Sequence, residues 1–269
     1  MHRELLVVVA LSACGGEELA GPDAGVVDAG PDALVGTPSI EGTPVASFET
    51  STCSTGSVLA LSRQIAEEVD CLMPGQLVAF EEGAAIAFAG SAVLPYVSDA
   101  GRADLFAATG MANGRVLRVT SGFRTVVQQY LLRRWYELGR CGITAAAQPG
   151  RSNHESGRAI DVSNYSEWRA TLEGNGWDQN VPGDPVHFEH LASPDIRGAD
   201  VLAFQRLWNR NAPDDRIAED GVYGPETEAR VQRAPAEGFG IGATCATRLP
   251  PAALDRILQT GLADPGCGH

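Results

Sequence analysis

The sequence contains no lysine, so arginine supplies all twenty of its basic residues, against 34 carboxylates and a net charge of −14. A chain this acidic repels the phosphates of nucleic acid, and nucleic acid is therefore excluded as a partner. Histidine is also scarce, because only five occur and two of them, His2 and His269, stand at the ends. The other three fall between positions 154 and 190, so a histidine-based site is expected there.

The N-terminus lacks an apolar run long enough to span a bilayer, since the run from Leu5 to Leu11 is short. Small residues and Cys14 follow it, and this order is typical of a bacterial lipoprotein signal. Residues 1–14 are thus predicted to be a signal peptide with its lipobox, and Cys14 to be the lipidation site. The alternative is a buried strand before a cysteine. The preferred interpretation implies an exported protein, lipid-anchored in the cell envelope, with the membrane as a partner.

Residues 15–45 contain no aromatic residue and are rich in Gly, Pro, Asp and Ala. Such a segment buries too little apolar surface to order itself, which predicts a flexible acidic linker. With about 30 flexible residues, its root-mean-square span is about 30 Å.

The remaining cysteines are expected to form disulfides, because export places them in an oxidising compartment and none shows the close spacing of a thiolate zinc site. Proximity in sequence favours two pairs, Cys53 with Cys71 and Cys245 with Cys267. Cys141 is then left over as a buried thiol.

An α+β domain is predicted over residues 46–192. Strand-like runs occur at 77–80, 84–88 and 116–119, and apolar residues at helical spacing predict a helix from Val126 to Leu138. The stretch 51–115 is otherwise interpreted only as scaffold.

A second, all-α domain is predicted over residues 196–248, followed by a tail at 249–269. Apolar residues from Val201 to Trp208 recur at three- and four-residue intervals, and Pro225 occupies the first position of a further helix.

The three internal histidines lie close in sequence to a candidate metal-binding carboxylate. Asp161 stands between Ile160 and Val162 in a run that resembles a buried strand, and a buried carboxylate needs a metal, an arginine or backbone donors. His154, Asp161 and a histidine from 184–190 are candidates for the three protein ligands of a catalytic zinc site. A salt-bridged structural aspartate beside a surface histidine is the alternative.

Residues 152–161 fit the pattern SxHxxGxAxD at every fixed position. This pattern resembles the zinc-binding signature of the D-alanyl-D-alanine carboxypeptidase family related to the vancomycin-resistance peptidases. The resemblance implies a small antiparallel sheet with flanking helices, and Zn²⁺ bound by His154 and Asp161. A second family element, an acidic residue three positions before a histidine, fits Asp184 and His187. It implies that His187 is the third ligand and Asp184 the catalytic base, with His190 as the rival ligand.

Upstream, the run from Ser121 to Arg124 resembles the serine-glycine-aromatic-arginine element of the same family, which gives Arg124 a catalytic, substrate-contacting role. A guanidinium suits a peptide's terminal carboxylate or a developing oxyanion. The alternative is an ordinary helix-start arginine paired with a carboxylate. Gln129 and Ser152 complete the predicted substrate-binding set, although packing or local hydrogen bonding also explains Gln129.

The C-terminal segment resembles a small helical peptidoglycan-binding domain, through Phe204-Gln205, then Asp220-Gly221, then Gly-Pro-x-Thr at 224–227. Both resemblances point to peptidoglycan. We expect a zinc-dependent D,D-carboxypeptidase that hydrolyses the terminal D-Ala of stem peptides, with no protein partner inferred. The alternatives are an endopeptidase of the L-alanyl-D-glutamate type and a non-catalytic wall-binding lipoprotein.

Overall fold

Four short strands form the central sheet of the computed structural model, which describes residues 36–245. They lie in the order β2 (Ile86–Phe88), β4 (Leu117–Ser121), β5 (Ala159–Val162) and β6 (His187–Glu189). β4, β5 and β6 are antiparallel neighbours, whereas β2 runs parallel to β4. The expected antiparallel sheet is therefore mixed, because the connection from β2 to β4 is long enough to cross over and return in the same direction.

That connection contains β3 (Tyr96–Val97) and the helix α3 (Asp99–Gly110). β3 pairs with β1 (Val78–Ala79) in a separate two-stranded antiparallel sheet. The expected α+β class is confirmed, and the predicted strand-like runs correspond to β1, β2 and β4.

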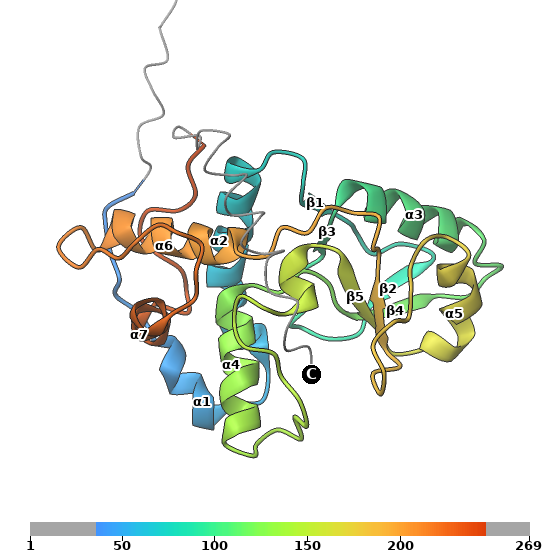
Figure 1. Ribbon diagram of the computed structural model, residues 1–269, viewed down its shortest axis with the longest axis horizontal. Helices are drawn as coiled ribbons and strands as arrows, with labels where there is room; N and C mark the ends of the chain where they lie inside the picture. The colour runs from blue at the N-terminus through green and yellow to red at the C-terminus, as the bar shows by residue number, and fades with distance from the viewer. Residues whose placement is uncertain (1–35, 246–269) are drawn as a thin grey trace, which may run out of the picture. The chain divides into compact units, whose positions relative to one another are not determined.

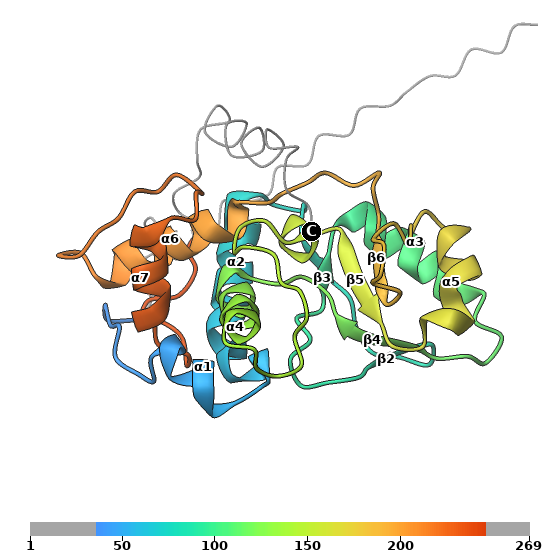
Figure 2. The same cartoon turned by 60° about the horizontal axis from the view of Figure 1, so that its bottom comes forward.

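The central sheet has two different faces, because neighbouring residues of a strand point to opposite sides. Ile160 and Val162 of β5 and Phe188 of β6 are buried in one core with α3 and α5 (Tyr165–Glu173). Figure 2 shows these two helices beside the sheet. The polar residues between and beside these apolar ones therefore point to the other face.

A second hydrophobic core lies among the remaining helices, which Figure 1 shows grouped together. Its main members are α2 (Leu59–Leu72), α4 (Val126–Glu137), α6 (Ala199–Asn211) and α7 (Pro225–Arg233). The short elements η1 (Val45–Ser47), α1 (Phe48–Ser51) and η2 (Thr55–Val58) precede α2. The predicted helices at 126–138, at 201–208 and from Pro225 are confirmed as α4, α6 and α7.

The second core joins the two predicted domains. α6 packs mainly against α2, and the Glu68 carboxylate of α2, fully buried, pairs with Arg206 at 2.8 Å and Arg210 at 3.0 Å. All described residues fall in one compact unit. The domain boundary that the sequence predicts at 192–196 stays a prediction. One apolar core contains residues from both sides of it.

The end of the predicted linker is ordered. The backbone N–H of Val45 donates to Ala234 O at 3.0 Å, and that of Gly240 donates to Ser39 O at 3.1 Å. Val45 is fully buried. Residues 39–45 therefore pack against the C-terminal segment, because their backbone finds partners that composition alone does not reveal. Residues 1–35, with Cys14, lie outside the described part.

The disulfide pairing expected from sequence proximity is wrong. Cys53 is bonded to Cys141, and Cys71 to Cys245. The error arises because the chain brings Cys141, just after α4, against the residues that precede α2. Cys267, the expected partner of Cys245, lies outside the described residues. Across residues 36–245, the structure contains no helix whose length and apolar character suit a membrane span.

Non-reducing peptide mapping is expected to recover two linked peptide pairs, Cys53–Cys141 and Cys71–Cys245. Replacing Cys53 and Cys141 together with alanine opens a cross-link between residues 88 positions apart. The loss of loop constraint in the unfolded chain destabilises the protein by about 4 kcal/mol, measured by urea unfolding. A linked Cys53–Cys71 peptide would contradict the structure.

Candidate active site

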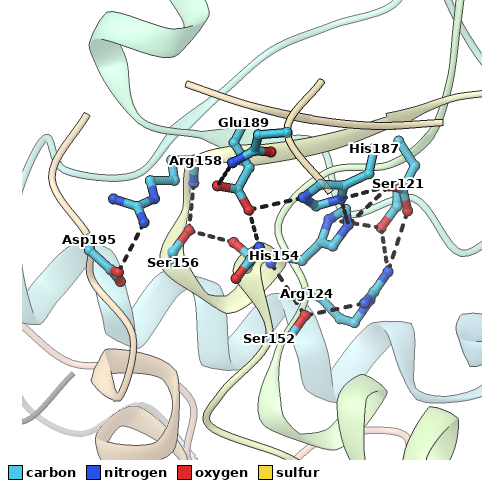
Figure 3. Close-up of polar contacts among 12 residues, drawn as sticks. Ser121, Arg124, Ser152, His154, Ser156, Arg158, His187, Glu189 and Asp195 are labelled. Carbon is cyan, nitrogen blue, oxygen red and sulfur yellow. Dashed lines mark hydrogen bonds and ion pairs between the residues drawn. The ribbon is translucent and has the colours of Figure 1, made fainter. Parts of the chain in front are cut away.

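Three side chains meet on the open face of the sheet, and Figure 3 shows two of them, His154 and His187, side by side. His154 Nε2 lies 3.1 Å from Asp161 Oδ1, and His187 Nδ1 lies 3.2 Å from each of these atoms. Asp161 and His187 are directly opposite each other on β5 and β6, while His154 comes from η3 (Asn153–Ser156). The structure thus brings together the three residues that the sequence predicts as metal ligands.

Each fixed position of the motif from Ser152 to Asp161 has a local role. Ser152 caps η3, and its hydroxyl accepts the N–H of His154 at 3.3 Å. Gly157 ends η3 at φ 73°, a left-handed conformation that favours glycine. Ala159 is buried and starts β5, whose alternation then presents Asp161 to the open face. The motif is a turn that places two side chains at a fixed separation.

Outer hydrogen bonds orient both imidazoles. His154 Nδ1 lies 2.8 Å from the carbonyl oxygen of Gly122, and His187 Nε2 lies 3.1 Å from Glu189 Oε1. If these nitrogens carry the protons, the two nitrogens that face Asp161 are free to bind a metal. A side chain at Gly122 would place its Cβ only 2.7 Å from Leu94 O, so glycine is required there.

The three facing atoms fit a metal ion of the zinc type. Two imidazole nitrogens and one carboxylate oxygen are a catalytic zinc donor set. A tetrahedral ion with bonds of about 2.0–2.1 Å has ligand atoms roughly 3.3 Å apart, close to the separations seen. Within residues 36–245, the side chains of the triad lie close enough together to hold an ion between them.

The charges of the triad favour metal binding at two of its members. Burial and the nearby guanidinium of Arg124 lower the pKa of His154. Burial alone would raise the pKa of Asp161, but the charges and hydrogen bonds of His154 and His187 hold it well below its usual range. Burial alone would lower the pKa of His187, but hydrogen bonds to Asp161 and Glu189 raise it to about 9. A neutral His154 and an ionised Asp161 are ready ligands, whereas His187 must release a proton.

Arg124 lies beside the triad. One guanidinium nitrogen, Nη2, is 3.5 Å from Asp161 Oδ2, and the other, Nη1, donates to Gln129 Oε1 at 3.1 Å and to Ser152 Oγ at 3.4 Å. Burial lowers the pKa of Arg124, and the charge of Asp161 opposes this shift. Gln129 also donates to Ala147 O at 2.8 Å, so its amide holds both the arginine and the following loop. The substrate-binding roles of these three residues stay predictions.

Asp184 lines the same cleft as the triad. The volume of this cleft is about 1010 Å³. Its carboxylate is half-buried, and its charge acts on Arg124. Asp184 stands three residues before His187, whose N–H donates to its carbonyl oxygen at 3.3 Å. This turn keeps Asp184 close to His187 of β6.

His190, the rival ligand, lies outside the triad. Its Nε2 is 2.8 Å from Asp104 Oδ2 and its Nδ1 is 2.7 Å from Ser193 Oγ. The ring packs against Trp177. Both ring nitrogens therefore have partners away from His154 and Asp161.

Glu189 is a site residue to which the sequence analysis gave no role. It is buried, and besides His187 its carboxylate accepts hydrogen bonds from Asn153 and from Asn180, the latter at 3.0 Å. The signal was present, because residues two apart on a strand share a face and Glu189 follows His187 by two. A carboxylate on the same face as a candidate ligand is expected to orient the ring of that ligand, which is the position that Glu189 occupies beside His187.

A pair of buried acids supports η3 from behind. Glu155 and Asp200 are both fully buried. The Glu155 carboxylate accepts the N–H groups of Gly150 and Ser152, each at 2.8 Å. Burial raises the pKa of Asp200 to about 7, while burial and the charge of Asp200 raise that of Glu155 well above its usual range. The pair therefore retains a proton in the folded protein at pH values where the unfolded chain has lost it.

Two imidazoles and a carboxylate thus meet on the open face of a small sheet as a group that could hold a metal ion. Residues 99–183, about a third of the chain, match the family model described as VanY: D-alanyl-D-alanine carboxypeptidase. Members of that family are zinc peptidases, and the match implies a peptidoglycan hydrolase of the D-Ala-D-Ala carboxypeptidase type. The matched span includes Arg124, His154 and Asp161 and ends just before Asp184. No curated protein and no solved structure matches the chain.

Asp200→Asn is expected to stabilise the protein at pH 8 by on the order of 4 kcal/mol. The folded pKa of Asp200, about 7, is above the unfolded value, so the folded state binds the extra proton. Its stability contribution is thus lost as pH rises from about 4 through 7, and the variant has no such loss. Urea unfolding at pH 4, 6 and 8 should show the difference growing with pH.

Asp215→Asn is the control in the same segment. A hydrogen bond from Arg230 lowers the pKa of Asp215, so that replacement should have the opposite effect and destabilise the protein at high pH. An Asp200→Asn effect independent of pH would contradict the pKa assignment.

Proposed function

We propose that the chain is a zinc-dependent D,D-carboxypeptidase that removes the terminal D-Ala of peptidoglycan stem peptides. The observation that carries the proposal is the convergence of His154 Nε2, Asp161 Oδ1 and His187 Nδ1 at mutual distances of 3.1–3.2 Å, next to Arg124 and within a cleft. The family match over residues 99–183 supports the substrate class.

Zinc is the ion that this donor set suits, and when bound it would polarise the scissile carbonyl and lower the pKa of the attacking water towards about 7. His154, Asp161 and His187 would hold it. Gly122 and Glu189 keep the two imidazoles in the required tautomers through their hydrogen bonds.

The remaining steps are assigned to Asp184 and Arg124, which both line the cleft. Asp184 takes a proton from the water as its oxygen bonds to the carbonyl carbon, and returns the proton to the amine of D-Ala as the C–N bond breaks. Arg124 donates to the developing oxyanion or to the terminal carboxylate of the substrate. Its hydrogen bonds to Gln129 and Ser152 keep the guanidinium in place before the substrate binds.

The same proposal places the enzyme outside the cytoplasm, because its polymer substrate is there. A signal sequence in residues 1–14 and a lipid anchor at Cys14 would supply export and attachment to the envelope. Residues 196–248 would add binding of peptidoglycan. The sequence patterns described above are the support for these three points.

His187→Gln is expected to abolish stoichiometric zinc binding, whereas His190→Gln should retain it. Only His187 presents a ring nitrogen to His154 and Asp161, while His190 is held by Asp104 and Ser193. Metal content is measured on purified protein after dialysis, with circular dichroism to verify folding. Retained zinc in folded His187→Gln would refute the ligand assignment.

Purified enzyme is expected to release free D-Ala from stem pentapeptides without cutting inside the stem. Asp184→Asn should keep its zinc but lower kcat by at least about 100-fold, because general base catalysis contributes roughly 10²–10⁴. Products are identified by mass spectrometry. Cleavage between L-alanine and D-glutamate would replace the proposal with the endopeptidase, and unchanged turnover by Asp184→Asn would reject the assigned base.

A further inference from the structure

The C-terminal segment supplies part of the wall of the cleft. Besides the loops at 143–153 and 180–184, the lining includes Arg197, just before α6, and Tyr223, between α6 and α7. Both lie within residues 196–248, the sequence module that resembles a peptidoglycan-binding domain. The module is therefore not confined to a surface remote from the triad.

The same segment supports the loop that carries His154. A Cβ added at Gly150 would lie 3.3 Å from Tyr223 Cβ and 3.4 Å from Val201 Cγ2, so these side chains pack directly on the loop backbone. The N–H of Ile196 donates to Ser156 O at 3.2 Å. Residues 196–223 are thus positioned by the same contacts that position the metal ligand.

One edge of the Arg197 guanidinium binds the Asp195 carboxylate, and the other edge is available to a ligand. Its Nε donates to both carboxylate oxygens of Asp195, at 3.0 and 2.9 Å, and its Nη2 to Oδ2 at 2.5 Å. The Nη1 donors have no hydrogen-bond partner within residues 36–245, and the side chain is 22% exposed. A guanidinium held in this way loses little conformational freedom when it binds a second carboxylate.

Asp195 does not cancel the charge of Arg197. Its carboxylate is 2% exposed and also pairs with Arg158 Nη2 at 3.3 Å, so one negative charge faces two guanidinium groups. Figure 3 shows the pair that Arg158 and Asp195 form. Arg158 does not line the cleft, whereas Arg197 does.

Charged side chains of both signs line the cleft. Four arginines, at positions 124, 133, 151 and 197, and two aspartates, at positions 161 and 184, belong to the lining. Arg133 pairs with Glu137 at 2.7 Å, and Arg124 lies 3.5 Å from Asp161. Guanidinium groups in such a lining offer hydrogen-bond donors to an anion that enters the cleft. Among the contacts within residues 36–245, none joins Arg197 to His154, Asp161 or His187.

We propose that Arg197 is a substrate-binding residue that recognises a second carboxylate of the peptide, remote from the bond that is cut. This inference rests on the proposed peptidase function and deepens it: the substrate class is an acidic peptide with an internal carboxylate as well as its C-terminal one. The C-terminal segment, through Arg197, sets the enzyme's preference for that class.

The test compares Arg197→Gln with Arg158→Gln on two matched peptides, one with a free internal carboxylate and one with that carboxylate amidated. Arg197→Gln is expected to raise KM for the free acid at least tenfold with kcat within about twofold, because a charge-assisted hydrogen bond is lost. Arg158→Gln removes the other partner of Asp195 and should leave KM unchanged. The wild type should prefer the free acid, and Arg197→Gln should not.

An equal effect of Arg197→Gln on both peptides, or none on either, overturns the inference. Calorimetric titration of each protein with the same peptides tests the carboxylate-binding role of Arg197 separately from the proposed peptidase function. If the wild type hydrolyses neither peptide, the proposed function fails, yet a tenfold weaker binding of the free acid by Arg197→Gln still supports the carboxylate site. Absence of any difference in binding overturns it.

Discussion

The pairing of Asp161 with His187 across β5 and β6 is the constraint on which the site depends. Their register is set on the other face of the sheet, where Ile160 and Phe188 are buried together. A slip of one residue would turn His187 into that core and Phe188 into the cleft, at the cost of burying a polar group and exposing an aromatic one. The hydrophobic core therefore determines the distance between the two candidate metal ligands.

This arrangement places an ionised carboxylate in a poorly solvated position, where charge is expensive. Asp161 is stabilised by the two imidazoles and by Arg124 at 3.5 Å. Each of these partners is in turn held by a buried or backbone group, as with His154 by Gly122 O and His187 by Glu189. Each polar group around the Asp161 carboxylate thus finds a hydrogen-bond partner in a further polar group. This need for partners explains why so many buried polar residues surround the site.

What the sequence predicted well is local. The motif from Ser152 to Asp161 spans one turn and the start of one strand, so its geometry follows from nearby residues, and the helix at 126–137 follows from its periodicity. The disulfide partners and the parallel pairing of β2 depend on where distant segments meet, and no local pattern encodes that. The position of Glu189 beside His187 was accessible from strand alternation, whereas the position of Arg197 in the cleft wall depends on where the chain before α6 lies.

The shared core of α2, α4 and α6 changes what a wall-binding sequence pattern means here. A module on a flexible tether contributes mainly effective concentration, because its contacts are independent of the reacting bond. A segment that packs on Gly150 and lines the cleft through Tyr223 has a fixed position relative to the triad. For the proposed enzyme, binding free energy gained there would be available to orient the peptide, since the cleft wall and the triad are held by one set of contacts. Substrate preference and the geometry of the candidate metal ligands would then be linked through the same backbone.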